Sequence, residues 1–271
     1  MLKDITLGQF FPGDTPVHRL DPRSKILLLI VFIVALFMAS GWAGYGLMLL
    51  VTALCMAISR ISPRNIFKGL KPMLFIIVFT AALNLFYTQG TPLFPGWPIT
   101  REGLERSVAM VLRIVLLIAG TFLLTYTTSP MALTDGMERL LNPLKKIGLP
   151  VHEITMMMSM ALRFIPTLIE ETDKIMSAQK ARGADFENGN LLQRAKALLP
   201  ILVPLFVSSF RRADELAVAM ESRCYHGGSG RTRMKQLHFA PRDLWALLLG
   251  AVLVAGMFSE GNGQRGLPGG T

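Results

Sequence analysis

The feature that most constrains the fold is a run of 33 residues without charge, from Ile26 to Ile58. A straight helix of that length would be about 50 Å long, whereas the hydrocarbon core of a bilayer is about 30 Å thick. Basic residues flank the run on both sides, and such flanks tend to stay cytoplasmic. We therefore predict two short spans that break at Ser40-Gly41-Trp42-Ala43-Gly44, with Trp42 and Tyr45 at the outer interface. One long tilted helix is the alternative.

Three further apolar runs suit membrane helices: Met73–Tyr87, Ser107–Tyr126 and Leu244–Ser259. The loop 88–100 contains no Lys or Arg, which is typical of an external loop. Arg113 interrupts the second of these runs, and a charge inside a span is costly. We expect this side chain to snorkel to the interface or to face protein or water.

Charge and composition support a membrane protein. Only 17% of the residues are charged, against about a quarter in soluble domains, and the mean hydropathy is +0.45. The net charge of +10 comes from basic residues in loops beside apolar runs, which favours the positive-inside pattern over nucleic-acid binding. We expect no signal peptide, a cytoplasmic N-terminus, a C-terminus outside the cell, and location in a prokaryotic plasma membrane.

The segment from Thr127 to Ala240 contains 15 of the 28 basic and 11 of the 18 acidic residues, so we place it in the cytoplasm. Helical patterns cover 132–147, 151–181 and 190–223, and Pro166, Pro200 and Pro204 are expected to bend the last two. The longest uncharged runs, 154–162 and 197–210, are shorter than a span of about 18 residues. We interpret them as interfacial or buried helices; an extra membrane hairpin is the alternative.

The predicted fold class is therefore an all-α integral membrane protein with about five transmembrane helices and a long cytoplasmic helical coupling domain. The expected domains are a cytoplasmic N-terminal segment (1–25), transmembrane helices 1–4 (26–128), the coupling domain (129–240), and a fifth transmembrane helix with an external tail (241–271).

Sequence motifs for catalysis are missing. No lysine follows a glycine, so the chain has no phosphate-binding loop of an ATPase, and it has no motif of a metalloprotease or serine hydrolase. The four histidines lack metal-ligand spacing, and Cys55 and Cys224 are too far apart to suggest a disulfide framework. We predict no enzyme activity, no metal and no cofactor.

Two similar tripeptides close the long helical patterns: Ala181-Arg182-Gly183 and Ser222-Arg223-Cys224. An arginine at a helix C-terminus interacts favourably with the helix dipole, worth about 0.3–1 kcal/mol. That role alone requires neither small neighbours nor a repeat. Small neighbours would let a helix end insert into a groove while the guanidinium makes two parallel hydrogen bonds to a carboxylate.

Three segments together resemble the T component of energy-coupling factor (ECF) transporters: HRLDPRSK before the first span, the Ala-Arg-Gly tripeptide, and the run RADELAVAMESRCYHGGSGRTRMKQL from Arg212 to Leu237. The resemblance implies a membrane scaffold that joins two cytoplasmic ABC-type ATPases, identical or different, to a small substrate-binding membrane protein, the S component. Arg182 and Arg223 match the family's two signature arginines, which dock into the ATPases. Ser-Arg-Cys departs from the family pattern, because it lacks the glycine.

The expected function is import of vitamins or other micronutrients, driven by ATP that the partner ATPases hydrolyse. The S component would contact apolar faces of the coupling domain, although these side chains could instead form the domain's own core: Met156, Met157, Met160, Leu198, Leu202 and Phe206. The alternative function is a conventional ABC importer permease that forms the pore itself. Such a permease usually has one coupling segment per subunit, so two arginine tips in one chain favour the scaffold. A membrane-embedded hydrolase would need a polar site within the spans, and the sequence has none.

Overall fold

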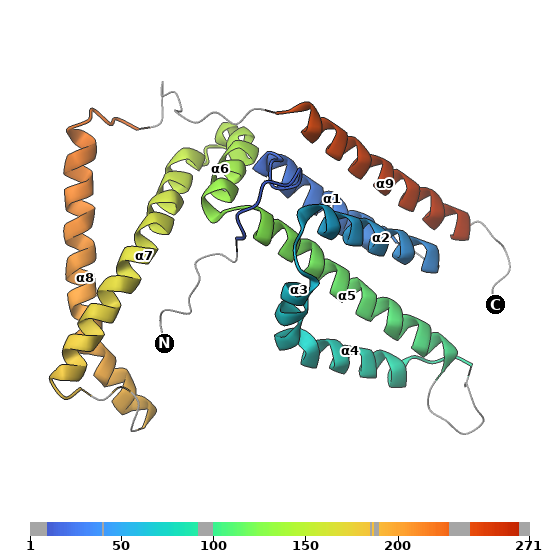
Figure 1. The fold of residues 1–271 in the computed structure, drawn as a ribbon, viewed down its shortest axis with the longest axis horizontal. Coiled ribbons are helices and arrows are strands. Elements are labelled where there is room, and N and C mark those ends of the chain that lie inside the picture. Colours follow the sequence, from blue (N-terminus) through green and yellow to red (C-terminus); the bar gives the residue numbers. More distant parts are fainter. Residues whose placement is uncertain are drawn as a thin grey trace. The chain divides into compact units, whose positions relative to one another are not determined.

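The computed structural model of the chain describes residues 10–39, 41–91, 100–184, 186, 190–227 and 239–265. These residues form helices and connecting loops, without a β-strand, which confirms the all-α class. The chain divides into two compact units. We call Gly8–Met137 with Leu237–Thr271 the membrane unit, and Met1–Leu7 with Glu138–Gln236 the hairpin unit (Figure 1).

The uncharged run at the start of the membrane unit folds as two helices, α1 (Pro22–Met38) and α2 (Gly41–Ser59), which confirms the predicted break. Gly41 has a φ of +79°, a left-handed conformation that glycine adopts without steric cost. Trp42 is exposed, as a residue at an interface should be. Tyr45 is buried against other helices, and its place at the outer interface stays a prediction.

Further helices of the described membrane unit follow α2. Helices α3 (Pro63–Leu70), η2 (Lys71–Met73) and α4 (Leu74–Tyr87) follow one another directly, so the predicted third span begins earlier than expected. α5 (Arg101–Thr127) packs against α1, α2, α3 and α4, and α9 (Pro241–Arg265) packs against α1. Helix α5 is therefore the central element of the unit.

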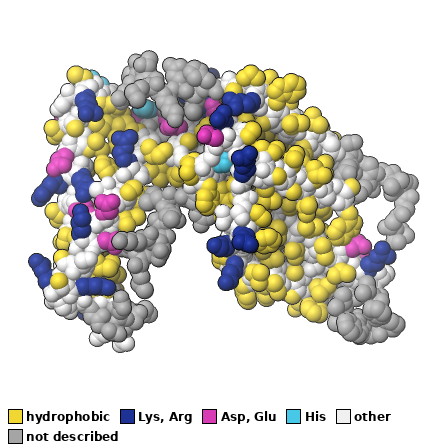
Figure 2. All heavy atoms as spheres, in the orientation of Figure 1, with side chains coloured by type: hydrophobic (Ala, Val, Ile, Leu, Met, Phe, Trp, Pro, Cys, Tyr) yellow, Lys and Arg dark blue, Asp and Glu magenta, His cyan; other side chains and the backbone are white. Residues whose placement is uncertain are grey.

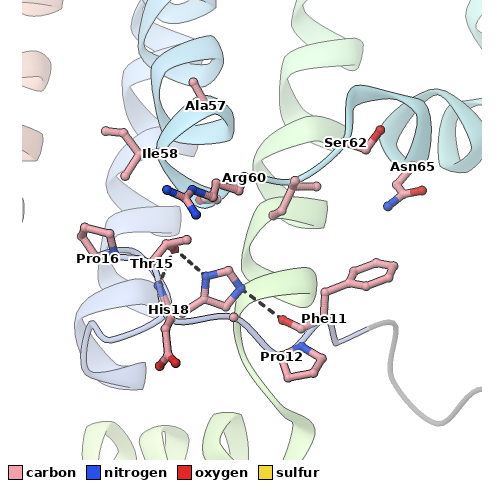
Figure 3. A pocket seen from close by; sticks show the side chains of 14 residues that line it. Phe11, Pro12, Thr15, Pro16, His18, Ala57, Ile58, Arg60, Ser62 and Asn65 are labelled. Atoms are coloured by element: carbon pink, nitrogen blue, oxygen red, sulfur yellow. Dashed lines mark hydrogen bonds between the residues drawn. The ribbon is translucent and has the colours of Figure 1, made fainter.

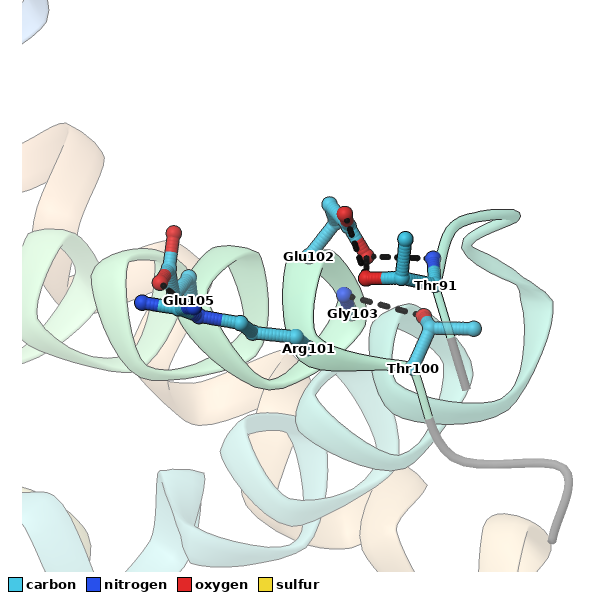
Figure 4. A network of polar contacts seen from close by, with 6 residues as sticks. All are labelled: Thr91, Thr100, Arg101, Glu102, Gly103 and Glu105. Atoms are coloured by element: carbon cyan, nitrogen blue, oxygen red, sulfur yellow. Dashed lines mark hydrogen bonds and ion pairs between the residues drawn. The ribbon is translucent and has the colours of Figure 1, made fainter. Parts of the chain in front are cut away.

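The start of α5 is fixed by side-chain hydrogen bonds (Figure 4). Thr100 Oγ1 accepts a hydrogen bond from the backbone N–H of Gly103, as an N-cap residue does. The Glu102 carboxylate accepts hydrogen bonds from the backbone N–H and the hydroxyl of Thr91. These contacts close the end of α5 onto the chain that follows α4.

Four helical segments of the described chain are long and apolar enough to cross a membrane: Gly41–Ser59, Pro63–Tyr87, Arg101–Thr127 and Pro241–Phe258. Helix α1 has 17 residues, at the short end of the range of about 17–25 residues for a membrane span. In the part of the chain that the structure describes, neither long helix of the hairpin unit is among these candidates.

Two apolar clusters form the core of the membrane unit. The first joins α1, α2, α5 and α9 through Leu36, Met48, Leu116 and Met257, and the second joins α3 to α5 around Tyr126. Hydrophobic side chains also cover much of the visible surface of this unit, and Lys and Arg gather mostly at one margin (Figure 2). Such exposed apolar surface on spanning helices is expected to face lipid.

The hairpin unit contains η3 (Asn142–Ile147), α7 (Val151–Ala181) and α8 (Leu191–Glu221), and α6 (Pro130–Leu141) spans the boundary between the units. Figure 1 shows that α7 and α8 run in opposite directions and cross, with the N-terminal part of α8 at an angle to the rest. Both helices continue through their internal prolines.

Candidate partner-docking site at two helix ends

The first arginine tip closes α7. Gly183 has a φ of +89°, its N–H donates to Lys180 O at 3.0 Å, and the N–H of Ala184 donates to Gln179 O at 3.0 Å. This pair of hydrogen bonds around a left-handed residue is a Schellman motif. Arg182 is the last residue before the left-handed one, and its side chain is exposed.

The second tip, at the end of α8, has the same backbone pattern. Cys224 has a φ of +55°, its N–H donates to Glu221 O at 2.8 Å, and the N–H of Tyr225 donates to Met220 O at 3.1 Å. Arg223 occupies the position of Arg182 and is also exposed. The cysteine therefore takes the left-handed conformation that glycine takes in the first tip.

The two tips lie at opposite ends of the α7–α8 pair. Contacts between the helices run in antiparallel order: Tyr225 with Met156, Ser208 with Glu171, and Pro200 with Gln179. Since Pro200 lies close to the end of α7, the rise of α8 places the tips on the order of 30 Å apart. Within the described residues, neither Arg182 nor Arg223 forms an ion pair. Both side chains are exposed, and a guanidinium can make two parallel hydrogen bonds to a carboxylate.

The six residues proposed to contact an S component do not form one surface. Met156 and Met157 lie near the second tip, whereas Leu198 and Leu202 lie near the first, because α7 and α8 are antiparallel. Exposure differs as well: Met157 and Phe206 are 61% and 62% exposed, while Met156 and Met160 are half-buried. Met156 accepts a hydrogen bond from the hydroxyl of Tyr225 and so contributes to the hairpin itself.

A cavity of about 690 Å³ lies in the membrane unit, between the segment before α1 and the junction of α2 with α3 (Figure 3). His18 bridges this segment, since its Nδ1 lies 2.6 Å from Thr15 Oγ1 and its Nε2 lies 3.1 Å from Phe11 O. Burial lowers the pKa of His18, which favours the neutral ring. A neutral ring protonated on Nε2 satisfies both contacts, because it accepts from Thr15 and donates to Phe11.

Two polar contacts in the membrane unit were not predicted from the sequence. Arg113 Nη2 donates to the hydroxyl of Tyr45 at 2.7 Å, and its guanidinium lies over the rings of Phe37 and Tyr45. Arg113 thus faces protein, one of the options that the sequence left open. The ammonium of Lys25 donates to His18 O, Thr127 O and Thr128 Oγ1.

A third missed contact links the long helices of the hairpin unit. Glu171 of α7 accepts hydrogen bonds from Ser208 and Arg212 of α8. The opposite charges of Glu171 and Arg212 are the only signal in the sequence. That signal is weak, because the segment contains many charges and their partners depend on the pairing of the helices.

The fold and the two tips together define a class: a helical membrane protein with an extended helical hairpin that presents two equivalent arginine ends. The cobalt transport protein family (CbiQ) matches residues 13–234. Proteins named energy-coupling factor transporter transmembrane protein EcfT are 57% identical in Clostridium kluyveri and 53% identical in Thermosediminibacter oceani. These alignments cover 94% of this chain in both cases, and 96% and 97% of the relatives.

The relative in Lactococcus lactis subsp. cremoris is 48% identical over 93% of this chain and 96% of its own length. The chain belongs to the EcfT family, the transmembrane components of energy-coupling factor transporters. This membership favours the scaffold over the conventional importer permease that the sequence left as the alternative.

Proposed function

We propose that this chain couples two cytoplasmic ABC-type ATPases to a substrate-binding S component in the membrane, with Arg182 and Arg223 as the ATPase contacts. The observation that carries the proposal is the equivalence of the two helix ends. The same backbone motif, the same position of the arginine and the same exposure recur at both ends of one hairpin. Two identical or similar ATPases would offer two similar grooves.

The mechanism follows from the geometry of the hairpin. ATP closes the ATPase pair, and the two grooves move relative to each other. A guanidinium held by two parallel hydrogen bonds to a carboxylate resists sliding, so each tip follows its groove. The long helices α7 and α8 then carry this displacement to the membrane unit and to the S component. The chain itself hydrolyses no ATP, because the phosphate-binding loop belongs to the partners.

The proposed topology places the hairpin unit in the cytoplasm, the N-terminus on the same side and the C-terminus outside the cell. Basic residues of the loops support this orientation, since the loop 88–100 has none while Arg60, Arg64, Lys68 and Lys71 follow α2. The S component would meet the exposed apolar side chains of the hairpin as two separate patches, one near each tip.

The proposal is tested by replacing Arg182→Ala and Arg223→Ala, singly and together. Cells co-express the variant, both ATPases and an S component, and we measure co-purification of the ATPases and uptake of a radiolabelled vitamin. Each single variant should weaken co-purification about 10-fold or more, as expected for loss of a charge-assisted bidentate contact, and the double variant should abolish uptake. The matched control is Arg163→Ala, an exposed arginine of α7 away from both tips.

If the double variant retains both ATPases and uptake at the level of the control, the tips are not the contacts. If Arg163→Ala lowers both readouts equally, general loss of positive charge explains the result and the proposal is wrong.

A further inference from the structure

A polar cluster links α7 to α8 midway along the hairpin. Glu171 Oε1 accepts a hydrogen bond from the hydroxyl of Ser208, and its Oε2 accepts one from Arg212 Nη2. The side chains of Glu171 and Arg212 are 22% and 30% exposed, so the pair is partly shielded from water. Because both carboxylate oxygens are held from the facing helix, the cluster fixes the orientation of the carboxylate as well as its distance.

The cluster lies at the same distance from both arginine tips, measured along the helix that carries each tip. Glu171 precedes Arg182 by eleven residues, and Arg212 precedes Arg223 by eleven residues. Eleven residues are close to three turns, so each tip lies about 16 Å along its helix from the cluster. The charges at the equivalent positions are opposite, which allows the two helices to pair there.

The helix arms between the cluster and the tips are free of proline. Pro166 precedes Glu171 in α7, and Pro200 and Pro204 precede Ser208 in α8. A proline inside a helix removes a backbone hydrogen bond and weakens the helix at that point. The two arms are therefore continuous hydrogen-bonded helix, while the proline-containing parts lie beyond the cluster.

We propose that Glu171, Ser208 and Arg212 form the pivot about which α7 and α8 turn when the ATPases move the two tips. The inference rests on the proposed function and adds the positioning residues through which it acts. Equal arms convert the closure of a pair of similar ATPases into equal displacements of both helices. Without the pivot the helices would slide or rotate against each other, and tip movement would be lost before it reached the membrane unit.

Exposed neighbours provide matched controls. Glu170 and Arg211 carry the same charges one residue away and are exposed on the same two helices. Glu171→Gln and Arg212→Gln remove the pivot charges, whereas Glu170→Gln and Arg211→Gln change net charge equally without touching the pivot. The double variant Glu171→Arg with Arg212→Glu exchanges the two charges and so keeps their attraction. Ser208 can remain part of the cluster, because its hydroxyl can accept a hydrogen bond from a guanidinium as well as donate one to a carboxylate.

The readout is the distance between the arms in the complete transporter with both ATPases. Cys55→Ser and Cys224→Gly remove the native thiols, and spin labels at Ser177→Cys and Val218→Cys then report the separation, each five residues before its tip. We expect one narrow distance distribution without nucleotide and another with ATP. Glu171→Gln should broaden both at least roughly 2-fold, because the two helices lose the ion pair that couples them at this point.

The exchanged pair should narrow the distributions again, and Glu170→Gln and Arg211→Gln should match the parent. Ser208→Ala removes one of the two contacts to the carboxylate, so it should broaden the distance distributions less than Glu171→Gln. This variant tests the same proposal if Glu171→Gln does not fold. Narrow distributions in Glu171→Gln or Ser208→Ala, or no recovery in the exchanged pair, would overturn the pivot. Failure of the proposed function would appear in a different measurement, the co-purification of the ATPases. The ATPases would then still co-purify with the variant that lacks both Arg182 and Arg223, or they would be lost from every pivot variant and control alike.

Discussion

The residue that departs from the family pattern, Cys224, is also one whose backbone carries strain. It adopts a left-handed conformation with a φ of +55°, in which a Cβ lies too close to the following carbonyl. The penalty is about 1–2 kcal/mol for a non-glycine residue. The sequence indicated a helix end here, because the tripeptide closes a long helical pattern. The conformation of Cys224 could not be predicted, because cysteine rarely takes it.

We predict that Cys224→Gly stabilises the second tip. Relief of the left-handed strain exceeds the entropy that glycine gains in the unfolded chain, about 0.5–1 kcal/mol, so the net gain is about 0.5–1 kcal/mol. Hydrogen exchange at the amide of Tyr225 should slow by a few-fold. Gly183→Ala, in open space but at a φ of +89°, should accelerate exchange at Ala184. Faster exchange in Cys224→Gly would contradict the strain argument.

At the scale of elements, Lys25 joins the N-terminal segment and α1 to the end of α5. Lys25 as a whole residue is 7% exposed. Its ammonium donates hydrogen bonds to two carbonyls and one hydroxyl, and one of these carbonyls belongs to Thr127, the last residue of α5. A cation at a helix C-terminus is stabilising. Nearby, Asp243 at the start of α9 accepts a hydrogen bond from Asp21 N–H. The segment HRLDPRSK thus ties three helices together.

Replacement of Lys25→Met should destabilise the membrane unit by about 1–3 kcal/mol, because buried acceptors lose their partner. The midpoint of thermal unfolding of the purified chain in detergent should fall accordingly. Arg19→Met is the control, since Arg19 is 58% exposed and makes only a surface ion pair with Asp14. An unchanged midpoint in Lys25→Met would show that the buried ammonium is not a structural link.

The sequence was sufficient to predict where the helices form. It was not sufficient to predict which side chains contact one another. The break near Gly41, the end of the helix at Gly183 and the existence of two long helices over 151–181 and 190–223 follow from charge, glycine and hydrophobic pattern. The pairs Arg113–Tyr45, Lys25–Thr127 and Glu171–Arg212 join residues that are 68, 102 and 41 positions apart. Such contacts depend on helix packing, which single-residue preferences do not determine.

At the scale of the whole molecule, one chain combines a membrane unit with a hairpin that bears two tips. In the proposed mechanism a second copy is unnecessary, because one chain would offer one tip to each ATPase. A conventional permease with one coupling segment per subunit needs two copies for the same task. The number of copies in the assembly therefore separates the two mechanisms.

The most direct measurement is the stoichiometry of the purified transporter by native mass spectrometry. Two arginine tips per chain predict a complex with one copy of this chain for each pair of ATPases and one S component. Arg182→Ala with Arg223→Ala should release the ATPases from this complex. Two copies of the chain for each ATPase pair would contradict the account, since each copy would then supply only one working contact.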